Sequence, residues 1–269
     1  MNDGAPMKSG PWSAPVTSLR VLELLAGLDW QRARVVDVGA GPGHFSRLIG
    51  EQLRQRGLTP AEHLWACDLI PESFEYEDVA CAPMSPDGRL PFEDASFDAV
   101  VSIEVIEHVE NQFAFMRELA RVAKPGGIVI VTTPNTLNAN SRLRTLFVGF
   151  PLLFDPLPIH GHDPRTLSGH IHPISPYFLA YNALRAGLQN PTFHPDRTKR
   201  SGVIYTTLLS PALLLARSLH RRRLRRKQPE VLRDENRDVI RMQASWALLT
   251  CRTSVLRAEK PGGRIRVDD

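Results

Sequence analysis

The sequence predicts a doubly wound α/β fold built on a mostly parallel sheet. Three observations support this prediction. A β-branched run at 35–38 leads into a glycine-rich turn at 39–43, after which apolar residues recur at helical spacing. A second short apolar run, at 64–68, also ends in an acid. Further apolar runs at 97–102 and 128–133 alternate with helical patterns, as expected for strands joined by crossover helices.

The glycine turn follows the first predicted strand and reads Gly39-Ala40-Gly41-Pro42-Gly43. Glycine permits sharp turns and lets a ligand approach the backbone, and the next helix points its N-terminus at the same place. A dinucleotide site would need Gly-x-Gly-x-x-Gly, but His44 replaces the third glycine. A phosphate-binding loop would need Lys followed by Ser or Thr, which this turn lacks. The turn therefore predicts a nucleotide-like ligand outside these two classes.

The flanking elements fit the same sheet. Residues 16–28 have an amphipathic helical pattern, and 79–82 is predicted as a short third strand. Asp68 ends the second strand about 25 residues past the turn, where a doubly wound sheet places the ligand's ribose. Its carboxylate is expected to accept hydrogen bonds from both ribose hydroxyls. The alternative is an ordinary acid at a strand end.

Four further motifs follow in order. They read DGRLPFEDASFDAVVS at 87–102, IEVIEHVEN at 103–111, KPGG at 124–127 and TPN at 133–135. With the glycine turn, these motifs resemble class I S-adenosylmethionine (SAM) dependent methyltransferases of the ubiquinone-biosynthesis-like type, methyltransferase domain type 11 or 23, over residues 33–135. The resemblance implies a Rossmann-like, seven-stranded, mostly parallel sheet. It also implies SAM as cofactor and methyl transfer as the activity.

The resemblance also implies roles for individual residues. Asp87 lies near the acid that contacts adenine in the family, and His108 is a general-base candidate because the segment after the fourth strand opens beside the sulfonium. His108 and Glu104 are four residues apart, so they would pair on one face if the segment were helical. The implied cofactor-binding residues are Asp37, Gly39, Ala40, Gly41, Gly43, Asp68, Leu69, Asp87, Ile103 and Glu104.

The remaining chain is predicted to complete one domain over residues 15–257, between flexible tails at 1–14 and 258–269. Ser175 caps a helix that Gly187 ends, and 193–197 and 247–255 are the expected sixth and seventh strands, an antiparallel edge in this family. Two segments do not belong to the common core: an insertion at about 137–173 and another at about 202–242.

The first insertion is expected to build the acceptor pocket or a lid, because it follows the carboxyl end of a strand. It contains His160, His162, His170 and His172. We expect no metal site, since no acid or cysteine has convincing ligand spacing apart from Asp155 and Asp163. A narrower hypothesis is that His172 or His170 takes a proton from the acceptor.

The second insertion is apolar at 203–216 and strongly basic at 217–227. Residues 135–269 carry 22 of the 33 Lys and Arg residues, so the overall charge of +4 divides into −8 for residues 1–134 and +12 for the rest. Segment 203–227 is therefore a candidate for contact with an anionic membrane surface. The alternative is a helical cap over the site with a basic outer end. Nucleic acid is disfavoured, because no aromatic residues are interleaved for base stacking.

The composition favours a cytoplasmic protein. The basic segment adds a further expectation, peripheral attachment at the inner face of the membrane. Three scattered cysteines argue for reduced thiols, the N-terminus lacks an apolar signal core, and no run reaches the ~20 apolar residues of a spanning helix. The expected function is methyl transfer to an oxygen or nitrogen of a small or lipid-like acceptor. The alternatives are a sugar or glycan-precursor acceptor, and a SAM-binding homologue without catalysis.

Overall fold

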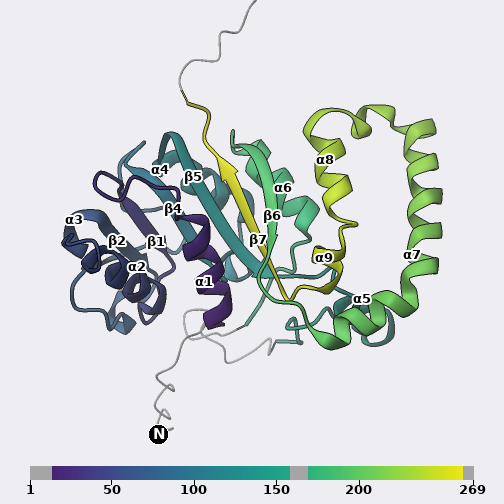
Figure 1. Ribbon diagram of the computed structural model, residues 1–269, viewed down its shortest axis with the longest axis horizontal. Coiled ribbons are helices and arrows are strands. Elements are labelled where there is room, and N and C mark those ends of the chain that lie inside the picture. The colour runs from purple at the N-terminus through teal and green to yellow at the C-terminus, as the bar shows by residue number, and fades with distance from the viewer. Residues whose placement is uncertain (1–13, 158–168, 263–269) are drawn as a thin grey trace, which may run out of the picture.

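The computed structural model describes residues 14–157 and 169–262. Seven strands form one sheet in the order β3-β2-β1-β4-β5-β7-β6, in which β7 runs antiparallel to both neighbours (Figure 1). This order confirms the predicted doubly wound, mostly parallel sheet with an antiparallel edge. The strands are β1 (Val35–Val38), β2 (Leu64–Asp68), β3 (Cys81–Pro83), β4 (Phe97–Ile103), β5 (Ala123–Pro134), β6 (Gln189–Pro195) and β7 (Thr253–Glu259).

Helices cover both faces of the sheet. In the described ranges 14–157 and 169–262, short 3₁₀ turns accompany them: η1 (Pro71–Ser73), η2 (Ile106–His108) and η4 (Pro229–Leu232). The α-helices are α1 (Pro15–Leu24), α2 (His44–Arg54), α3 (Pro60–His63), α4 (Gln112–Val122), α5 (Ala139–Val148), α6 (Pro176–Arg185), α7 (Arg200–Lys227), α8 (Asp234–Met242) and α9 (Trp246–Thr250).

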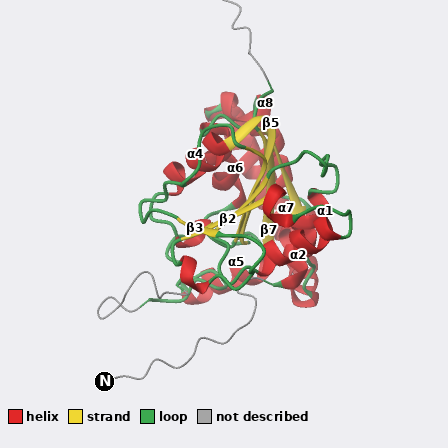
Figure 2. Cartoon of the chain, turned by 90° about the vertical axis from the view of Figure 1, so that its left-hand side faces the viewer, coloured by secondary structure: helices red, strands yellow, loops and turns green. Residues whose placement is uncertain are grey.

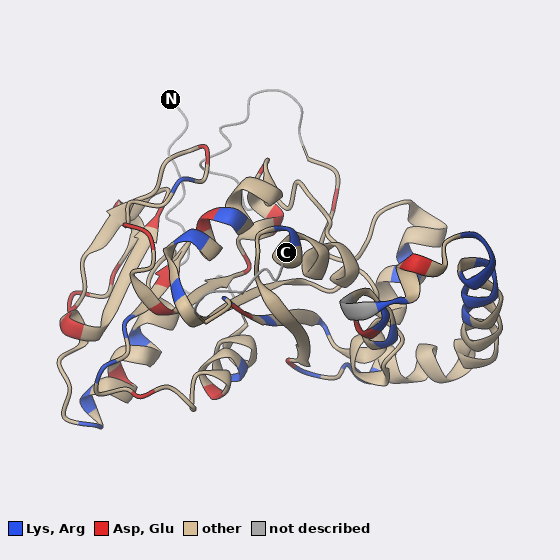
Figure 3. Ribbon diagram, turned by 90° about the horizontal axis from the view of Figure 1, so that it is seen from above, with Lys and Arg blue, Asp and Glu red and all other residues tan. Residues whose placement is uncertain are grey.

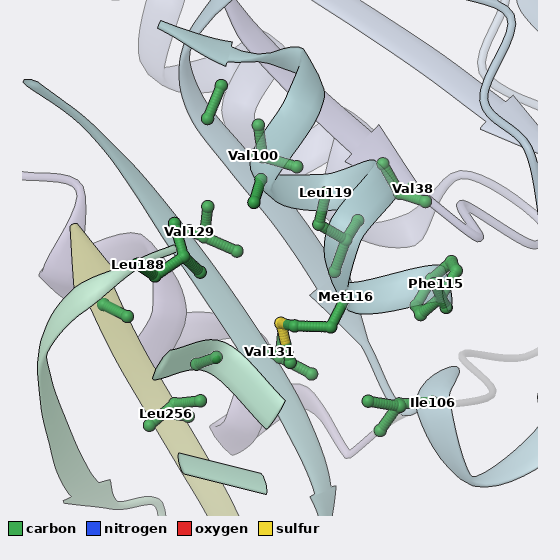
Figure 4. Packing of buried hydrophobic residues seen from close by; sticks show 14 of the residues in the cluster. Val38, Val100, Ile106, Phe115, Met116, Leu119, Val129, Val131, Leu188 and Leu256 are labelled. Atoms are coloured by element: carbon green, nitrogen blue, oxygen red, sulfur yellow. The ribbon is translucent and has the colours of Figure 1, made fainter. Parts of the chain in front are cut away.

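The core consists of two apolar layers, one on each face of the sheet. Each layer lies beneath the helices that flank the sheet in Figure 2. On one face, Met116 and Leu119 of α4 pack with Val100 and Val131, and Figure 4 shows this layer from close by. On the other face, α1 and α2 pack against alternate strand residues such as Val101. Because the central strands are buried on both sides, they read as continuous apolar runs. Burying a side chain such as that of Leu119 contributes about 1.5–3 kcal/mol to the free energy of folding.

Three strands, β7, β6 and β3, differ from the sequence-based prediction. The expected seventh strand at 247–255 is wrong in its first half, because Trp246–Thr250 is the helix α9 and the strand begins at Thr253. The Ser245 side chain accepts a hydrogen bond from the backbone N–H of Leu248, which caps this helix at its first turn. The sixth strand begins earlier than predicted, at Gln189, and the third is shifted to Cys81–Pro83.

The insertions are largely helical. The first insertion contains α5, which begins soon after β5. Residues 158–168 of this insertion, which include His160 and His162, lie outside the described part. The second insertion joins β6 to β7 and contains α7, η4 and α8. Most of the predicted tails also lie outside the described residues, although β7 continues to Glu259, two residues past the expected domain end.

Within the described residues, α7 is the one helix long and apolar enough to cross a membrane by length and composition. An 18-residue window in it has a mean hydropathy of 1.4, and 11% of that window is buried. The expectation that no run reaches ~20 apolar residues stays a prediction, because this window holds 18 residues and the apolar part 203–216 ends before Arg217. Pro211 lies inside this helix. The Thr207 carbonyl, which loses its usual N–H partner to the proline, accepts from the Ser210 hydroxyl at 2.8 Å.

Candidate functional site

The glycine turn is a strained loop that only glycine can form easily. Gly39, Gly41 and Gly43 have φ angles of 74°, 51° and 82°, all in the left-handed region. A Cβ atom on Gly39 would clash with the side chain of Val105, and one on Gly43 would lie 2.9 Å from Phe74 Cε2. The turn is held to the next strand because the N–H groups of Gly39 and Ala40 donate to the Cys67 carbonyl. Bare backbone is thus presented at the carboxyl end of β1.

Asp68 lies beside this turn with its carboxylate fixed by backbone donors. The N–H of Gly41 donates to Oδ2 at 2.8 Å, and the N–H of Ile70 donates to Oδ1 at 2.8 Å. Asp68 is 9% exposed. Each carboxylate oxygen has a second lone pair, so the group can still accept from two hydroxyls of a ribose. This geometry fits the nucleoside part of the predicted cofactor.

Asp37 lies beneath the turn and joins it to the first helix. Its Oδ2 accepts a 2.7 Å hydrogen bond from the hydroxyl of Ser46 on α2. Burial raises the pKa of Asp37 to about 7, although the Ser46 hydroxyl acts in the opposite direction. Asp37 is 2% exposed, so its contact with α2 is structural and positions the turn from below.

Glu104 directly follows Ile103, the last residue of β4, and has an unusual backbone. Its φ is 57°, a conformation that costs a non-glycine residue about 1–3 kcal/mol and is often found at functional sites. Its N–H donates to the carbonyl and the hydroxyl of Thr132, at 3.2 and 3.0 Å. Burial raises the pKa of the Glu104 carboxyl, against the charge of Arg252. A helical pairing of Glu104 with His108 is wrong, because only the short turn η2 forms there.

His108 belongs instead to a cluster with Glu107 and His170. The His108 and His170 rings meet edge to face with centroids 4.9 Å apart, and His170 Nε2 lies 4.0 Å from Glu107 Oε1. The Gly169 carbonyl lies 2.8 Å from His108 Nδ1. Because a carbonyl only accepts, Nδ1 carries the hydrogen and Nε2 remains a proton acceptor. Burial lowers the pKa of both imidazoles, so both are neutral at pH 7.

Glu107 is the residue of this cluster that the sequence reasoning missed. It is fully buried, and neither carboxylate oxygen has a hydrogen-bond partner among the residues that the structure describes. Burial, then the nearby Glu104 charge, raises the pKa of Glu107 well above its ordinary value. The available signal was an acid inside an apolar run, Val105-Ile106-Glu107-His108-Val109. Ligand atoms of Glu107, His108 and His170 lie within 4.8 Å of one another.

The other predicted residues lie around this centre to differing degrees. Ala40 and Leu69 are half-buried at the turn and just after Asp68. Asp87 lies in an exposed turn and accepts from the backbone of Arg89 at 3.2 Å, so its predicted adenine contact stays a prediction. His172 is exposed, and its Nδ1 lies 2.9 Å from the carbonyl oxygen of Val109. The ring of His170, in contrast, contacts the ring of His108.

Comparisons with known proteins agree with this geometry. A family model described as "Methyltransferase domain" matches residues 36–131. A probable SAM-dependent methyltransferase of Mycolicibacterium smegmatis is 50% identical over 104 residues, which are 38% of each chain. A ubiquinone biosynthesis O-methyltransferase of Rhodopseudomonas palustris is 30% identical over 164 residues, which are 56% of this chain and 59% of that protein.

The chain spans less than two thirds of the length of the curated relatives it matches. Among solved structures, a SAM-dependent methyltransferase from Archaeoglobus fulgidus superposes with a TM-score of 0.54 at 15% identity, covering 91% of this chain and 93% of that one. At this identity the likeness supports the fold alone. The sequence matches cover the glycine turn, Asp68 and the segment of Glu107 and His108.

Proposed function

Because this chain belongs to the class I SAM-dependent methyltransferases, with the methyltransferase domain at residues 36–131, we propose that it transfers a methyl group to an oxygen or nitrogen of a small or lipid-like acceptor. The observation that carries the proposal is the contact between two features at the carboxyl ends of the neighbouring strands β1 and β4. One is the glycine turn, and the other is the segment of Glu104 and His108, whose Val105 side chain lies against Gly39.

The cofactor fits residues of this chain. The bare backbone of Gly39 to Gly43 allows close approach, and the fixed carboxylate of Asp68 is suited to accept from ribose hydroxyls. SAM, when bound, supplies a methyl group already activated by the positive sulfonium. The protein therefore needs mainly to align the acceptor with that methyl group and exclude water.

A neutral oxygen or nitrogen acceptor also loses a proton during transfer, and we assign its removal to His108. Its Nε2 is the free acceptor atom because Nδ1 donates to the Gly169 carbonyl. The lowered pKa keeps the ring neutral at pH 7, as a base requires. His170 contacts His108, and its Nε2 lies 4.0 Å from Oε1 of the buried Glu107. In this arrangement His170 positions His108.

The test is a screen of lipid, quinone and glycan extracts with methyl-labelled SAM, followed by identification of the labelled product. Label in the lipid or quinone fraction is expected. With the product known, His108→Ala should slow transfer by about 10²–10⁴-fold while the Kd for SAM changes less than twofold. His172→Ala tests the other candidate base, and wild-type transfer by this variant would leave proton removal with His108. Equal losses of transfer and SAM affinity in His108→Ala would show that His108 is structural.

The same screen separates the other functions. Label in the glycan fraction alone would favour a sugar or glycan-precursor acceptor. SAM binding by calorimetry without label in any fraction would favour a binding protein that lacks catalysis. We further propose a cytoplasmic location at the inner face of the membrane, and the basic end of α7 supports this proposal through its charge.

A further inference from the structure

Helix α7 stands away from the body of the protein for most of its length (Figure 1). It is attached near its start, where the Thr206 hydroxyl donates to the Leu249 carbonyl at 3.2 Å, and near its end, where Leu224 is buried. Between 207 and 223 none of its residues is buried. A 28-residue helix with so little tertiary contact leaves its apolar side chains in water, which a soluble fold normally avoids.

The outward side of α7 carries a narrow apolar stripe. At 100° per residue, positions 204, 208, 215 and 219 fall within about 60° of one another, opposite the buried positions 202, 206 and 224. Exposed fractions in the stripe are 56% for Ile204, 72% for Leu208, 63% for Leu215 and 54% for Leu219. Arg222 and Arg226 continue the same stripe, so it is apolar first and cationic at its end.

Helix α5 adds apolar surface beside the start of α7. The Asn140 side chain of α5 donates to the Ser201 hydroxyl of α7 at 3.2 Å, and the two helices lie side by side there. The end of α5 exposes Leu146 and Phe147, at 74% and 79%. Exposed apolar surface concentrated on two adjoining helices marks an interaction site. Because α5 follows β5, this site adjoins the carboxyl edge of the sheet, where the methyl transfer is proposed.

Charge identifies the kind of partner. Six of the seven residues from 221 to 227 are Arg or Lys, and none of the six forms an ion pair within the part of the chain that the structure describes. Figure 3 shows this blue cluster at the end of α7, far from the sheet. Each basic residue near an anionic leaflet contributes about 1 kcal/mol. A second copy of this chain would bring two such clusters into the same interface, which like charges oppose.

The length of the apolar part indicates how α7 lies. Residues 203–216 cover about 21 Å at about 1.5 Å per residue, less than the roughly 30 Å hydrocarbon core of a bilayer. We propose that the outward face of α7, with the exposed end of α5, lies in the surface of an anionic bilayer, leucines toward the acyl chains and arginines among the headgroups. Resting on the proposed function, this surface places the acceptor site at the membrane, where a lipid-like acceptor would enter.

The test measures binding of the full chain to vesicles of phosphatidylcholine with 30% phosphatidylglycerol by flotation. We expect binding that weakens with salt and is much lower on pure phosphatidylcholine. Leu208→Glu with Leu215→Glu should lower the partition coefficient by at least about tenfold. Leu19→Glu, at an exposed leucine of α1, is the matched control and should bind as wild type. Arg222→Gln with Arg226→Gln should lower binding by about fivefold for each arginine.

Undiminished binding by the leucine pair variant would overturn the proposal, and so would equal binding to neutral and anionic vesicles. The wild-type chain could instead fail to bind vesicles and form a dimer that Leu208→Glu disrupts. That result would show that a second copy covers α7. SAM affinity and melting temperature of each variant verify that it folds. If the chain binds vesicles but labels no extract, the proposed activity fails while the membrane surface stands.

Discussion

Replacing Asp37 with Asn should remove a strong pH dependence of stability. Burial raises the pKa of Asp37 from 3.8 to about 7. At about 1.4 kcal/mol for each pKa unit, ionising this carboxyl in the folded state costs about 4 kcal/mol more than in the unfolded chain. The raised pKa means that the folded protein keeps a proton between pH 4 and pH 7 that the unfolded chain has lost. The contribution of Asp37 to the free energy of unfolding is therefore greatest below pH 4 and decreases as the pH rises to about 7.

The assay is urea unfolding of wild type and Asp37→Asn at half-unit steps from pH 5 to pH 8, without SAM. The variant's free energy of unfolding relative to wild type should rise across this range by about 1.4 kcal/mol per pH unit up to pH 7, then level off. Ser46→Ala is the control, because losing the hydroxyl that donates to Asp37 should destabilise the protein more at pH 8 than at pH 5. A relative stability of Asp37→Asn that stays flat with pH would refute the reasoning.

Three further changes test the turn and the end of β5. Gly39→Ala should destabilise by about 2 kcal/mol or more and weaken SAM binding in calorimetry, since Cβ would meet Val105 at a φ of 74°; an unchanged Kd would contradict this. Asp68→Asn should weaken SAM binding about tenfold or more, because the amide brings an N–H group to a site that two backbone donors occupy; wild-type affinity would exclude Asp68 from the site. Asn135→Ala should lower the free energy of unfolding by about 2–4 kcal/mol, since Nδ2 donates to the Leu248 carbonyl at 2.6 Å and to that of Cys251; a loss below about 0.5 kcal/mol in urea unfolding would count against it.

The fold was accessible to sequence reasoning wherever the pattern is local. Val35–Val38 and Phe97–Ile103 are apolar on both sides because both faces of the sheet are covered, and this leaves a continuous apolar run that is easily read. The edge of the sheet was harder to predict. The mostly apolar run 247–250 is compatible with a strand and with a helix. The hydrogen bond from the Leu248 N–H to the Ser245 side chain, which selects the helix, is not visible in the apolar pattern.

The candidate site divides in the same way. The order of the glycine turn, Asp68 and the motif around His108 follows from the sequence, because these residues lie at the ends of successive parallel strands. The meeting of His108 with His170 joins segments 62 positions apart, and no local pattern encodes such a contact. The burial of Glu107 likewise depends on packing from several elements.

The sequence by itself determined the position of the glycine turn and of the central strands, because each depends on residues close together in the chain. The order of the strands and the class of cofactor followed from the resemblance of five ordered motifs over residues 33–135. Only the tertiary structure decided which imidazole approaches His108, how Asp68 is held by the N–H of Gly41, and which side of α7 is left uncovered. These features arise from contacts between distant segments, whose geometry is set by the packing of the whole domain.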